Sequence, residues 1–440
     1  RTERVVLIEA GPGGTTCARV GCMPSKLLIA AAEAAHRARE AEGFGVRASV
    51  EIDAARVLER VRAERDRFVG FVLRDVDEID PQYKLTGRAR FLDAHTLEVG
   101  GGLEVRVRAK AFVIATGSSP SVIPLLADLG DRLLVSDDVF ELERLPESIA
   151  VFGPGVIGLE LGQALARLGV RVRMFGVGGL VGPLSDPDVL AYARETFREE
   201  LSLDSDAKVH SVRREGDGVA IEFEDRARGR VTERFERVLA ATGRAPNVRG
   251  LGLEHTGIAL RKNGVPEIDP ATLRAGDSSI YLAGDVTGHL PLLHEAADEG
   301  RIAGENAARH PDPIPGVRRS PLTVVFSDPQ IAIVGGGWRA VSEADPVVGE
   351  VRFDHQGRSR VMLRNRGILR VYADRASGRF LGAEMIGPDA EHLAHLMAWA
   401  HQARLSVASM LAMPFYHPVV EEGLRTALRD AHAKIARLTT

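Results

Sequence analysis

The chain is poor in cysteine and has no long apolar run. Only Cys17 and Cys22 occur among 440 residues, which excludes a structural disulfide framework. No uninterrupted apolar stretch approaches the roughly 20 residues that span a bilayer, and the first residues lack a basic-then-apolar signal layout. We therefore expect a cytoplasmic protein with no membrane segment.

A large excess of one charge is missing too. Lys and Arg number 57 against 61 Asp and Glu, for a net charge of −4. Nucleic-acid-binding domains normally carry a basic patch or stripe, so nucleic acid is not an expected partner. The composition, 45% hydrophobic and 27% charged, is that of an ordinary globular protein. The length suits about three or four domains.

A complete nucleotide-binding turn is predicted near residue 150. Residues 149–152 have the pattern of a buried strand, 159–168 of a helix and 170–175 of a second strand, and Gly153, Gly155 and Gly158 lie in the turn between the first strand and the helix. These glycines allow a pyrophosphate to approach the N-terminus of the helix, where unpaired N–H groups favour an anion. Gly176 stands where the ribose-binding acid of such units is expected, and no arginine pair follows. The choice between NAD and NADP therefore stays open.

The first residues indicate a second nucleotide-binding unit. Residues 4–9 are typical of a strand ending in an acid, Glu9, with a glycine-rich stretch after it. In a Rossmann unit the glycine turn lies about 20 residues before this acid, so we expect that the sequence lacks the true start of the protein. An unrelated edge strand with an exposed Glu is the alternative. The tripeptide at residues 115–117 recurs at 241–243, which suggests a duplicated nucleotide-binding architecture.

The two cysteines form the main candidate for chemistry. In a regular helix they would lie about 7.5 Å apart along the axis and on different faces, too far apart for a disulfide. Gly21 permits a distorted turn, and Pro24 suits the first position of the next helix. Cys22 would then lie at a helix N-terminus, where the dipole stabilises a thiolate. The alternatives are two inert thiols or half of a zinc site, but no second closely spaced Cys/His pair supplies the other ligands, and we predict no metal site.

Several motifs together resemble the FAD-dependent pyridine nucleotide-disulfide oxidoreductases, of which dihydrolipoamide dehydrogenase is the nearest member. They are Thr16-Cys17 to Cys22-Met23-Pro24-Ser25-Lys26, the glycine turn with Glu160, both Ala-Thr-Gly tripeptides, Gly284-Asp285 and residues 326–335. The resemblance runs from residue 4 to about 430. It implies an α/β fold with two Rossmann-like domains, for FAD and NAD(P), and a C-terminal α+β dimerisation domain. The implied domains are residues 1–143 for FAD, 144–246 for NAD(P), 247–315 as the return segment of the FAD or central domain, and 316–440 for dimerisation.

The resemblance also implies cofactor-binding residues. Glu9 would hold the adenosine ribose of FAD, Asp285 its ribitol chain, and Lys26 would lie beside the flavin and pair with Glu160. The full set implied is Glu9, Thr16, Lys26, Ala115, Thr116, Gly117, Asp285 and His294 for FAD, and Gly153, Gly155, Gly158, Glu160 and Gly243 for NAD(P).

The catalytic residues implied are Cys17, Cys22, His417 and Glu422. Cys22 would face the flavin and Cys17 would exchange with the substrate. His417, oriented by Glu422, would act as the base on the disulfide of the other subunit, which implies a homodimer. The expected partner is a small dithiol or disulfide substrate, with lipoamide preferred, or a lipoyl domain.

Other acceptors remain open. Val419 stands where dihydrolipoamide dehydrogenases usually have Thr, and the tandem Glu421-Glu422 is also found in glutathione reductases, although these usually carry Lys at the place of Ser25. Mercuric reductases and large thioredoxin reductases need further C-terminal redox residues, and because the chain has no third cysteine both are disfavoured. Direct reduction of quinones or metal ions from the flavin is a further alternative. If residue 1 is the start of the protein, a non-catalytic scaffold protein is another alternative.

Overall fold

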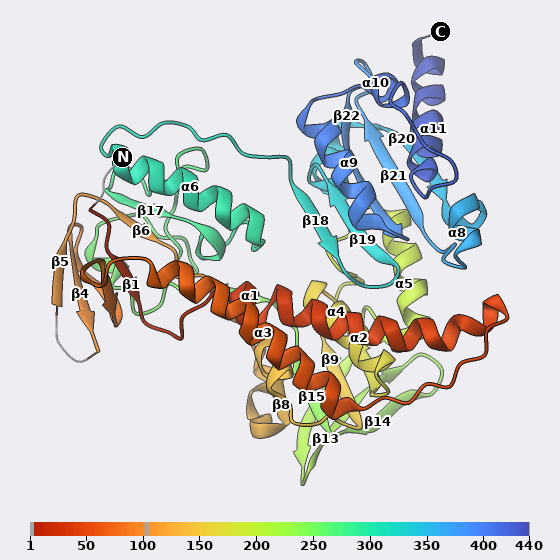
Figure 1. Cartoon of the computed structure of the whole chain (residues 1–440), viewed down its shortest axis with the longest axis horizontal. Helices are drawn as coiled ribbons and strands as arrows, with labels where there is room; N and C mark the ends of the chain where they lie inside the picture. Colours follow the sequence, from red (N-terminus) through yellow and green to blue (C-terminus); the bar gives the residue numbers. More distant parts are fainter. Residues whose placement is uncertain (1–3, 102–104, 440) are drawn as a thin grey trace. The chain divides into compact units, whose positions relative to one another are not determined.

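The computed structural model describes residues 4–101 and 105–439 (Figure 1). The chain folds into two compact units, each described here by itself. Unit 1 is built from the chain up to Pro24, from Ala63–Ser121 and from Gly243–Arg318, and unit 2 from Ser25–Arg62, Val122–Thr242 and the chain from Arg319 onward. Both units combine helices with sheets, which confirms the expected α/β class.

The strands of unit 1 form small sheets. Its strands are β1 (Leu7–Glu9), β2 (Lys84–Thr86), β3 (Arg88–Asp93), β4 (Thr96–Gly100), β5 (Val105–Arg108), β6 (Phe112–Ile114), β7 (Ser118–Pro120), β16 (Arg244–Pro246) and β17 (Ile280–Leu282). β1 pairs with β2 and β17 with β6 in parallel, whereas β16–β7 and β3–β4–β5 are antiparallel. A core that includes Phe91, Phe112 and Ile280 stabilises this unit.

The helical segments of unit 1 flank these strands. They are α1 (Thr16–Val20), α6 (Leu293–Arg309) and the short η2 (Pro81–Tyr83), η5 (Leu253–His255) and η6 (Gly284–Thr287). α6 packs against β17 and β6, as Figure 1 shows. Two long helices, α2 (Cys22–Glu40) and α3 (Ala54–Asp77), belong partly to each unit.

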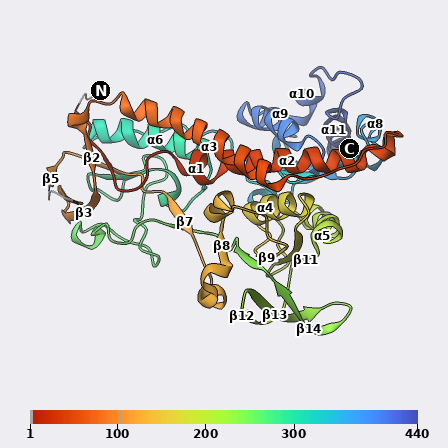
Figure 2. The ribbon, with the colours of Figure 1, turned by 60° about the horizontal axis from the view of Figure 1, so that its bottom comes forward.

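The first half of unit 2 contains a parallel sheet in the order β11-β10-β9-β15-β8. Its elements are η1 (Ala41–Phe44), η3 (Pro124–Arg132), β8 (Leu133–Val135), η4 (Ser136–Glu141), β9 (Ser148–Phe152), α4 (Val156–Arg167), β10 (Arg171–Phe175), α5 (Pro187–Leu201), β11 (Leu203–Asp204) and β15 (Arg237–Ala240), together with the antiparallel sheet β12 (Val209–Glu215), β13 (Gly218–Asp225) and β14 (Gly229–Phe235). α4 and α5 contact the parallel sheet (Figure 2). The strand, turn, helix and strand predicted near residue 150 are confirmed as β9, α4 and β10.

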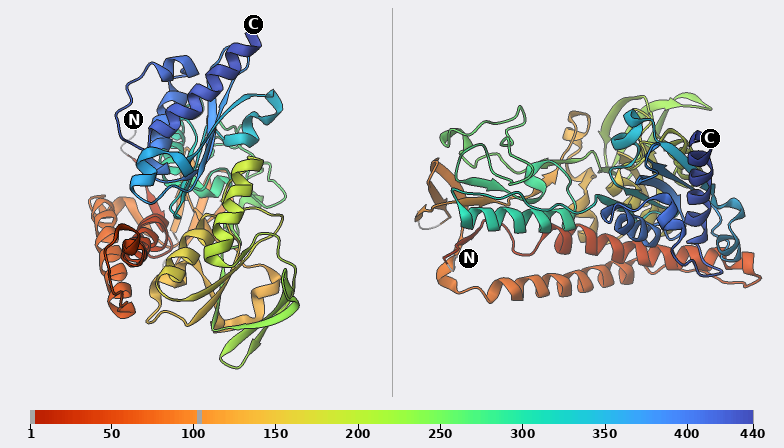
Figure 3. Two further views of the ribbon diagram at one scale, coloured as in Figure 1. Left: turned by 90° about the vertical axis from the view of Figure 1, so that its right-hand side faces the viewer. Right: turned by 90° about the horizontal axis from the view of Figure 1, so that it is seen from above.

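The C-terminal half of unit 2 is an antiparallel sheet with helices against it. The strand order is β18-β19-β22-β21-β20. The elements are β18 (Leu322–Val325), β19 (Gln330–Val334), α7 (Gly337–Val341), η7 (Ser342–Ala344), β20 (Val347–Arg352), η8 (Phe353–His355), α8 (Gly357–Val361), β21 (Ile368–Ala373), β22 (Phe380–Gly387), α9 (Ala390–Gln402), α10 (Val407–Leu411) and α11 (Glu422–Thr439). α9 packs on β19 and β22, and α11, the dark-blue helix that ends at the label C in Figure 3, packs on β20 and β21.

Across the described ranges, 4–101 and 105–439, the structure has no helix that is both long and apolar enough to cross a membrane.

Candidate functional site

The glycine turn of unit 2 is closely packed. β9 is buried along its whole length, as expected for a central parallel strand. Gly153 has φ +103°, and a Cβ on Gly158 would overlap the carbonyl oxygen of Gly153. Gly155 caps α4, whose first N–H groups therefore lie at the turn. This is the arrangement that binds a pyrophosphate at a helix N-terminus.

Lys26 of α2 and Glu160 of α4 form an ion pair. Lys26 Nζ lies 2.7 Å from Glu160 Oε2, and the carboxylate is only 4% exposed. The other oxygen, Glu160 Oε1, accepts the backbone N–H of Phe326 at 3.0 Å, and Lys26 Nζ lies 4.5 Å from the centroid of the Phe326 ring. Both oxygens of the buried carboxylate are thus hydrogen-bonded, which offsets the cost of burying its charge. The sequence predicted the pair but not the part played by Phe326.

The polar network continues along α4 beyond this pair. Gln163 Nε2 donates to Glu200 Oε2 at 2.6 Å, and Gln163 Oε1 accepts from Asp328 N at 2.7 Å. Arg167 binds both Glu200, at 2.6 Å, and Asp328, at 3.1 Å. Burial alone would raise the pKa of Asp328, but Arg167 and Arg364 outweigh it and hold that pKa below its usual range. Sequence spacing gave no sign of this network.

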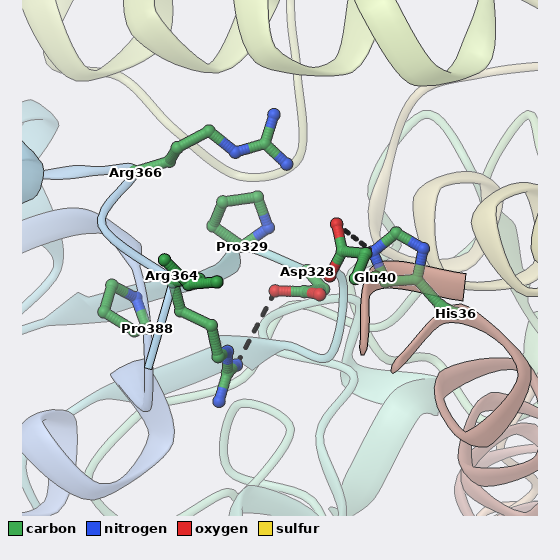
Figure 4. Close-up of a pocket in the computed structure, with 8 residues that line it drawn as sticks. His36, Glu40, Asp328, Pro329, Arg364, Arg366 and Pro388 are labelled. Atoms are coloured by element: carbon green, nitrogen blue, oxygen red, sulfur yellow. Dashed lines mark ion pairs between the residues drawn. The ribbon is translucent and has the colours of Figure 1, made fainter. Parts of the chain in front are cut away.

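A cavity of about 240 Å³ lies beside Asp328 (Figure 4). In the figure, dashed lines mark an ion pair of Asp328 with Arg364, 3.6 Å apart, and one of His36 with Glu40, 3.2 Å apart. Burial, together with Arg167, lowers the pKa of His36, which favours a neutral imidazole at pH 7. The acids Glu40 and Asp328 are balanced in number by Arg364 and Arg366, so the cavity offers little net charge to a ligand.

The helix breaks between the two cysteines. Cys17 is the second residue of α1, and Cys22 is the first residue of α2. Gly21 between the helices has φ −126° and ψ −114°, and a Cβ there would lie 2.9 Å from the carbonyl oxygen of Thr16. Both cysteines are half-buried. The distorted turn and the place of Cys22 at a helix N-terminus agree with the prediction from the sequence.

Pro24 requires a correction. It is the third residue of α2, not the first as expected. Proline fits there because the first helical N–H groups have no partner within the helix, so nothing is lost by the missing donor.

Asp285 is held by a hydrogen-bond chain within unit 1. Ser118 Oγ donates to Asp285 Oδ2 at 2.6 Å, and Arg244 Nε donates to Ser118 Oγ at 2.8 Å. The preceding Gly284 N donates to the buried Glu299 at 2.8 Å. Asp285 therefore has a fixed orientation that the sequence motif alone did not reveal.

The two Ala-Thr-Gly tripeptides lead into strands that pair with each other. Ala115, Thr116 and Gly117 connect β6 to β7, and Gly243 precedes β16, the antiparallel partner of β7. Thr116 Oγ1 donates to the carbonyl of Asn247 at 2.7 Å. Gly117 and Gly243 have φ of +68° and +102°, a backbone conformation that suits glycine.

Three further predicted FAD residues lie in unit 1. Glu9 ends β1 and is exposed, with its carboxylate accepting the N–H of Gly11 at 2.9 Å. Thr16 opens α1. His294 is the exposed second residue of α6.

His417 and Glu422 are in contact. His417 Nδ1 lies 3.1 Å from Glu422 Oε2, and the histidine side chain is 81% exposed. Glu422 is the first residue of α11, and Val419 N also donates to it at 3.4 Å. The hydrogen bond from His417 lowers the pKa of Glu422, so the carboxylate stays charged near neutral pH. The imidazole is thus oriented through Nδ1, which leaves Nε2 for proton transfer.

The predicted residues divide between the two units. Unit 1 holds Cys17, Cys22, Gly243 and the FAD residues other than Lys26. Unit 2 holds the Lys26–Glu160 pair, the glycine turn and the His417–Glu422 pair.

Comparison with known protein families assigns nearly the whole chain. Residues 2–300 match the family described as pyridine nucleotide-disulphide oxidoreductase, and residues 322–428 match the dimerisation domain of the same family. The chain belongs to this family.

The named relatives of this oxidoreductase have two different activities. The dihydrolipoyl dehydrogenase of Haloferax volcanii is 31% identical over 97% of this chain and 90% of its own length. The mercuric reductase of Streptomyces lividans is also 31% identical, over 99% of this chain and 92% of its own length. Relatives of both kinds therefore align equally well.

Solved structures agree on the fold. LpdA from Mycobacterium tuberculosis is 27% identical with a TM-score of 0.83, over 97% of this chain and 93% of that one. The HOCl-induced flavoprotein disulfide reductase RclA from Escherichia coli has a TM-score of 0.80 at 24% identity, over 97% of this chain and 93% of that one. This second likeness supports the fold alone.

The oxidoreductases of this family are FAD-dependent, use NAD(P)H as electron donor and form homodimers through the dimerisation domain. The polar groups of unit 1 suit FAD. Glu9 and the fixed Asp285 offer carboxylate oxygens, which suit the hydroxyl groups of the ribose and ribityl chain.

Proposed function

We propose that this oxidoreductase transfers electrons between NAD(P)H and a small disulfide or dithiol, with dihydrolipoamide, free or on a lipoyl domain, as the preferred substrate. The observation that carries the proposal is the helix break that separates Cys17 from Cys22 and puts Cys22 at the start of α2. A thiolate at a helix N-terminus is stabilised by the dipole, as a redox cysteine requires.

In this proposal the cysteines divide the chemistry. Reduction of one disulfide consumes one NAD(P)H and one proton and yields NAD(P)+ and two thiols. Bound FAD supplies hydride acceptance from the nicotinamide. Cys22 faces the flavin, and Cys17, half-buried like Cys22, exchanges with the substrate sulfur. Lys26 brings a positive charge to the flavin, and Glu160 holds that charge in place.

His417 is the proposed base for the dithiol. Its Nδ1 is held by Glu422, so the exposed Nε2 takes a proton from a substrate thiol or returns one. Each subunit serves the cysteine pair of the other subunit, which is why the homodimer belongs to the proposal. The exposure of His417 in the single chain supports this assignment.

The proposed function implies a division of the chain into domains. We propose residues 1–143 as the FAD domain, 144–246 as the NAD(P) domain, 247–315 as the return segment and 316–440 as the dimerisation domain. The proposal also includes the remaining FAD-binding residues, among them Thr16, Ala115, Gly117 and His294.

The visible spectrum tests the proposal. The holoenzyme is treated with NADH without oxygen, and a long-wavelength absorbance band from a thiolate beside the flavin is expected. Cys22→Ser should retain FAD, lose the band and lose lipoamide turnover. Simple bleaching in the wild-type protein, or normal lipoamide turnover in Cys22→Ser, would overturn the cysteine relay.

Reduction of a metal ion is a second candidate function, because relatives named mercuric reductase are as similar as the dihydrolipoyl dehydrogenases. Assays with lipoamide and with Hg(II), each driven by NADH, separate the two. Turnover of Hg(II) that exceeds that of lipoamide would favour the second candidate. Activity that survives Cys17→Ser would indicate electron transfer to the acceptor directly from the flavin.

A further inference from the structure

The end of β10 has no room for the acid that usually binds the adenosine ribose. A Cβ on Gly176 would lie 2.8 Å from Pro154 Cγ and 2.8 Å from the carbonyl oxygen of Ser205. Contacts this short with backbone require a shift of the neighbouring chain. Pro154 in the turn and Gly176 after the strand are therefore a matched pair, and β10 itself cannot easily carry a ribose-binding side chain.

The neighbouring strand carries carboxylates at the same level. Gly176 N donates to the carbonyl of Asp204 at 2.7 Å, and the carbonyl of Gly176 accepts from Ala207 N at 2.9 Å. Residues 205 and 206 therefore lie opposite Gly176, about one strand spacing of 4.8 Å away. Both β10 and β11 end here, at the carboxyl edge of the parallel sheet, which is the edge where nucleotides bind.

The side chain of Asp206 is turned toward the loop that follows β10. Its Oδ1 accepts the N–H of Gly178 at 2.8 Å. A Cβ on Gly178 would meet nothing within 4 Å, so the space beside Gly178 is open. No ion pair of Asp206 is found in residues 4–101 and 105–439, and its second oxygen can accept hydrogen bonds from a ligand.

Arg194 and Arg226 contact this region of the chain but already have partners. Arg194 lies halfway along α5, which leads away from the carboxyl edge, and its Nε donates to the carbonyl of Gly179 at 2.5 Å. Arg226 Nη2 lies 3.5 Å from Asp204 Oδ1. The loop at residues 176–183 has no basic residue.

We infer that Asp206, in the turn that follows β11, determines the nucleotide specificity of this enzyme, because its carboxylate accepts hydrogen bonds from the ribose hydroxyls of NADH and repels the 2′-phosphate of NADPH. The inference rests on the proposed function only in its use of NAD(P)H. It is independent of the disulfide substrate. A carboxylate accepts hydroxyl groups strongly, whereas it meets a phosphate as a like charge.

The test is the rate of flavin reduction in the holoenzyme, measured without oxygen against NADH and NADPH. The wild-type rate constant should be at least about 100-fold larger with NADH. Asp206→Asn keeps the acceptor for Gly178 N–H but removes the charge. It should lower the NADH constant about tenfold, as expected for loss of a charged hydrogen bond, and raise the NADPH constant.

The matched control is Asp128→Asn. Asp128 is exposed in η3, which precedes β8 and so lies toward the amino edge of the same parallel sheet. This variant should keep the wild-type ratio of the two constants. The inference would be overturned if Asp206→Asn had the same ratio of NADH to NADPH rate constants as the wild type. It would also be overturned if the wild type preferred NADPH and this preference were lost in Arg194→Gln. Failure of the disulfide relay would leave flavin reduction unchanged, so the two proposals fail separately.

Discussion

The Lys26–Glu160 and His417–Glu422 pairs of unit 2 both join a carboxylate to a nitrogen base, and they differ in burial. Glu160, at 4% exposure, bonds to Lys26 and to the backbone of Phe326. Glu422 holds His417, whose side chain is 81% exposed. The first pair is held between α2, α4 and the backbone at Phe326. The second lies on an exposed edge at the start of α11.

The difference teaches what each pair can do. A buried pair is costly to break, because the remaining charge loses its partner, and such a pair fixes a charge in one place. An exposed pair contributes little to folding, yet its imidazole can meet a substrate or a second subunit. The structure thus separates a charge that is held in place from an exposed imidazole, which is the group proposed to transfer protons.

The largest expected effect follows from removing the exposed base. His417→Gln should slow dithiol oxidation by about 10²- to 10⁴-fold, the usual contribution of a general base. Flavin reduction by NADH should stay at the wild-type rate, because His417 is proposed to act only on the dithiol. Steady-state lipoamide assays and stopped-flow flavin reduction measure the two halves.

His432→Gln is the matched control for this variant. His432 is exposed on α11, the same helix that begins at Glu422. It should keep both rates. Equal slowing of both half-reactions in His417→Gln would mean that the substitution acts on the fold and not on proton transfer.

The next effect follows from breaking the buried pair. Glu160→Gln retains an acceptor for Phe326 N–H but leaves the Lys26 ammonium uncompensated. We expect a loss of about 1–3 kcal/mol in the free energy of unfolding, toward the lower end because Lys26 stays a third exposed. Urea unfolding of the holoenzyme measures it.

Glu195→Gln gives the comparison for Glu160→Gln. Glu195 pairs with Arg198 on the surface of α5 and is 69% exposed. Its loss should leave the unfolding midpoint within the scatter of replicates. If Glu195→Gln destabilises as much as Glu160→Gln, burial does not explain the difference between the two kinds of pair.

The resemblance to a family predicted both pairs, but only one of them is local in the sequence. The spacing of five residues between His417 and Glu422 is bridged within one turn, so the contact depends only on the start of α11. The β9–α4–β10 unit is similarly local, since alternation of apolar residues and glycines at fixed offsets is sufficient to predict it. Lys26 and Glu160 lie 134 residues apart, and only the resemblance to a family indicated that they meet.

The rest of the site depends on distant backbone. Phe326 donates its N–H to Glu160 from 166 residues away, and Asp328 reaches Gln163 over 165 residues. Backbone donors leave no pattern in a sequence, and polar partners on separate elements have no shared period. The position of Asp206 could not be predicted from the sequence either, because the usual pattern has the acid at the end of β10 and Asp206 lies in the turn after the neighbouring strand, β11.

A smaller effect concerns pH and the network next to the buried pair. Arg167 and Arg364 hold the pKa of Asp328 below its ordinary value of 3.8 despite burial. Its contribution is therefore present above about pH 4 and is lost as pH falls through the folded pKa. Asp328→Asn should cost about 1 kcal/mol at pH 7, and the difference from the wild type should shrink below about pH 4.

Urea midpoints across this pH range test the prediction for Asp328, with the exposed Asp128→Asn as a control that should show no such convergence. A difference that stays constant down to about pH 3, below the ordinary pKa of an aspartate, would assign the loss to packing and not to the charge of Asp328.

The smallest effect is expected from the exposed pair itself. Glu422→Gln should leave the unfolding midpoint unchanged within error, although dithiol oxidation slows, because solvent already surrounds His417. Raising the salt to about 1 M, where charges are screened beyond about 3 Å, should move the wild type and this variant by the same amount. Thermal unfolding at low and high salt measures both. A clear loss of stability in Glu422→Gln that disappears at high salt would show that this pair also stabilises the fold. The two pairs would then differ only in how much they contribute to the free energy of unfolding.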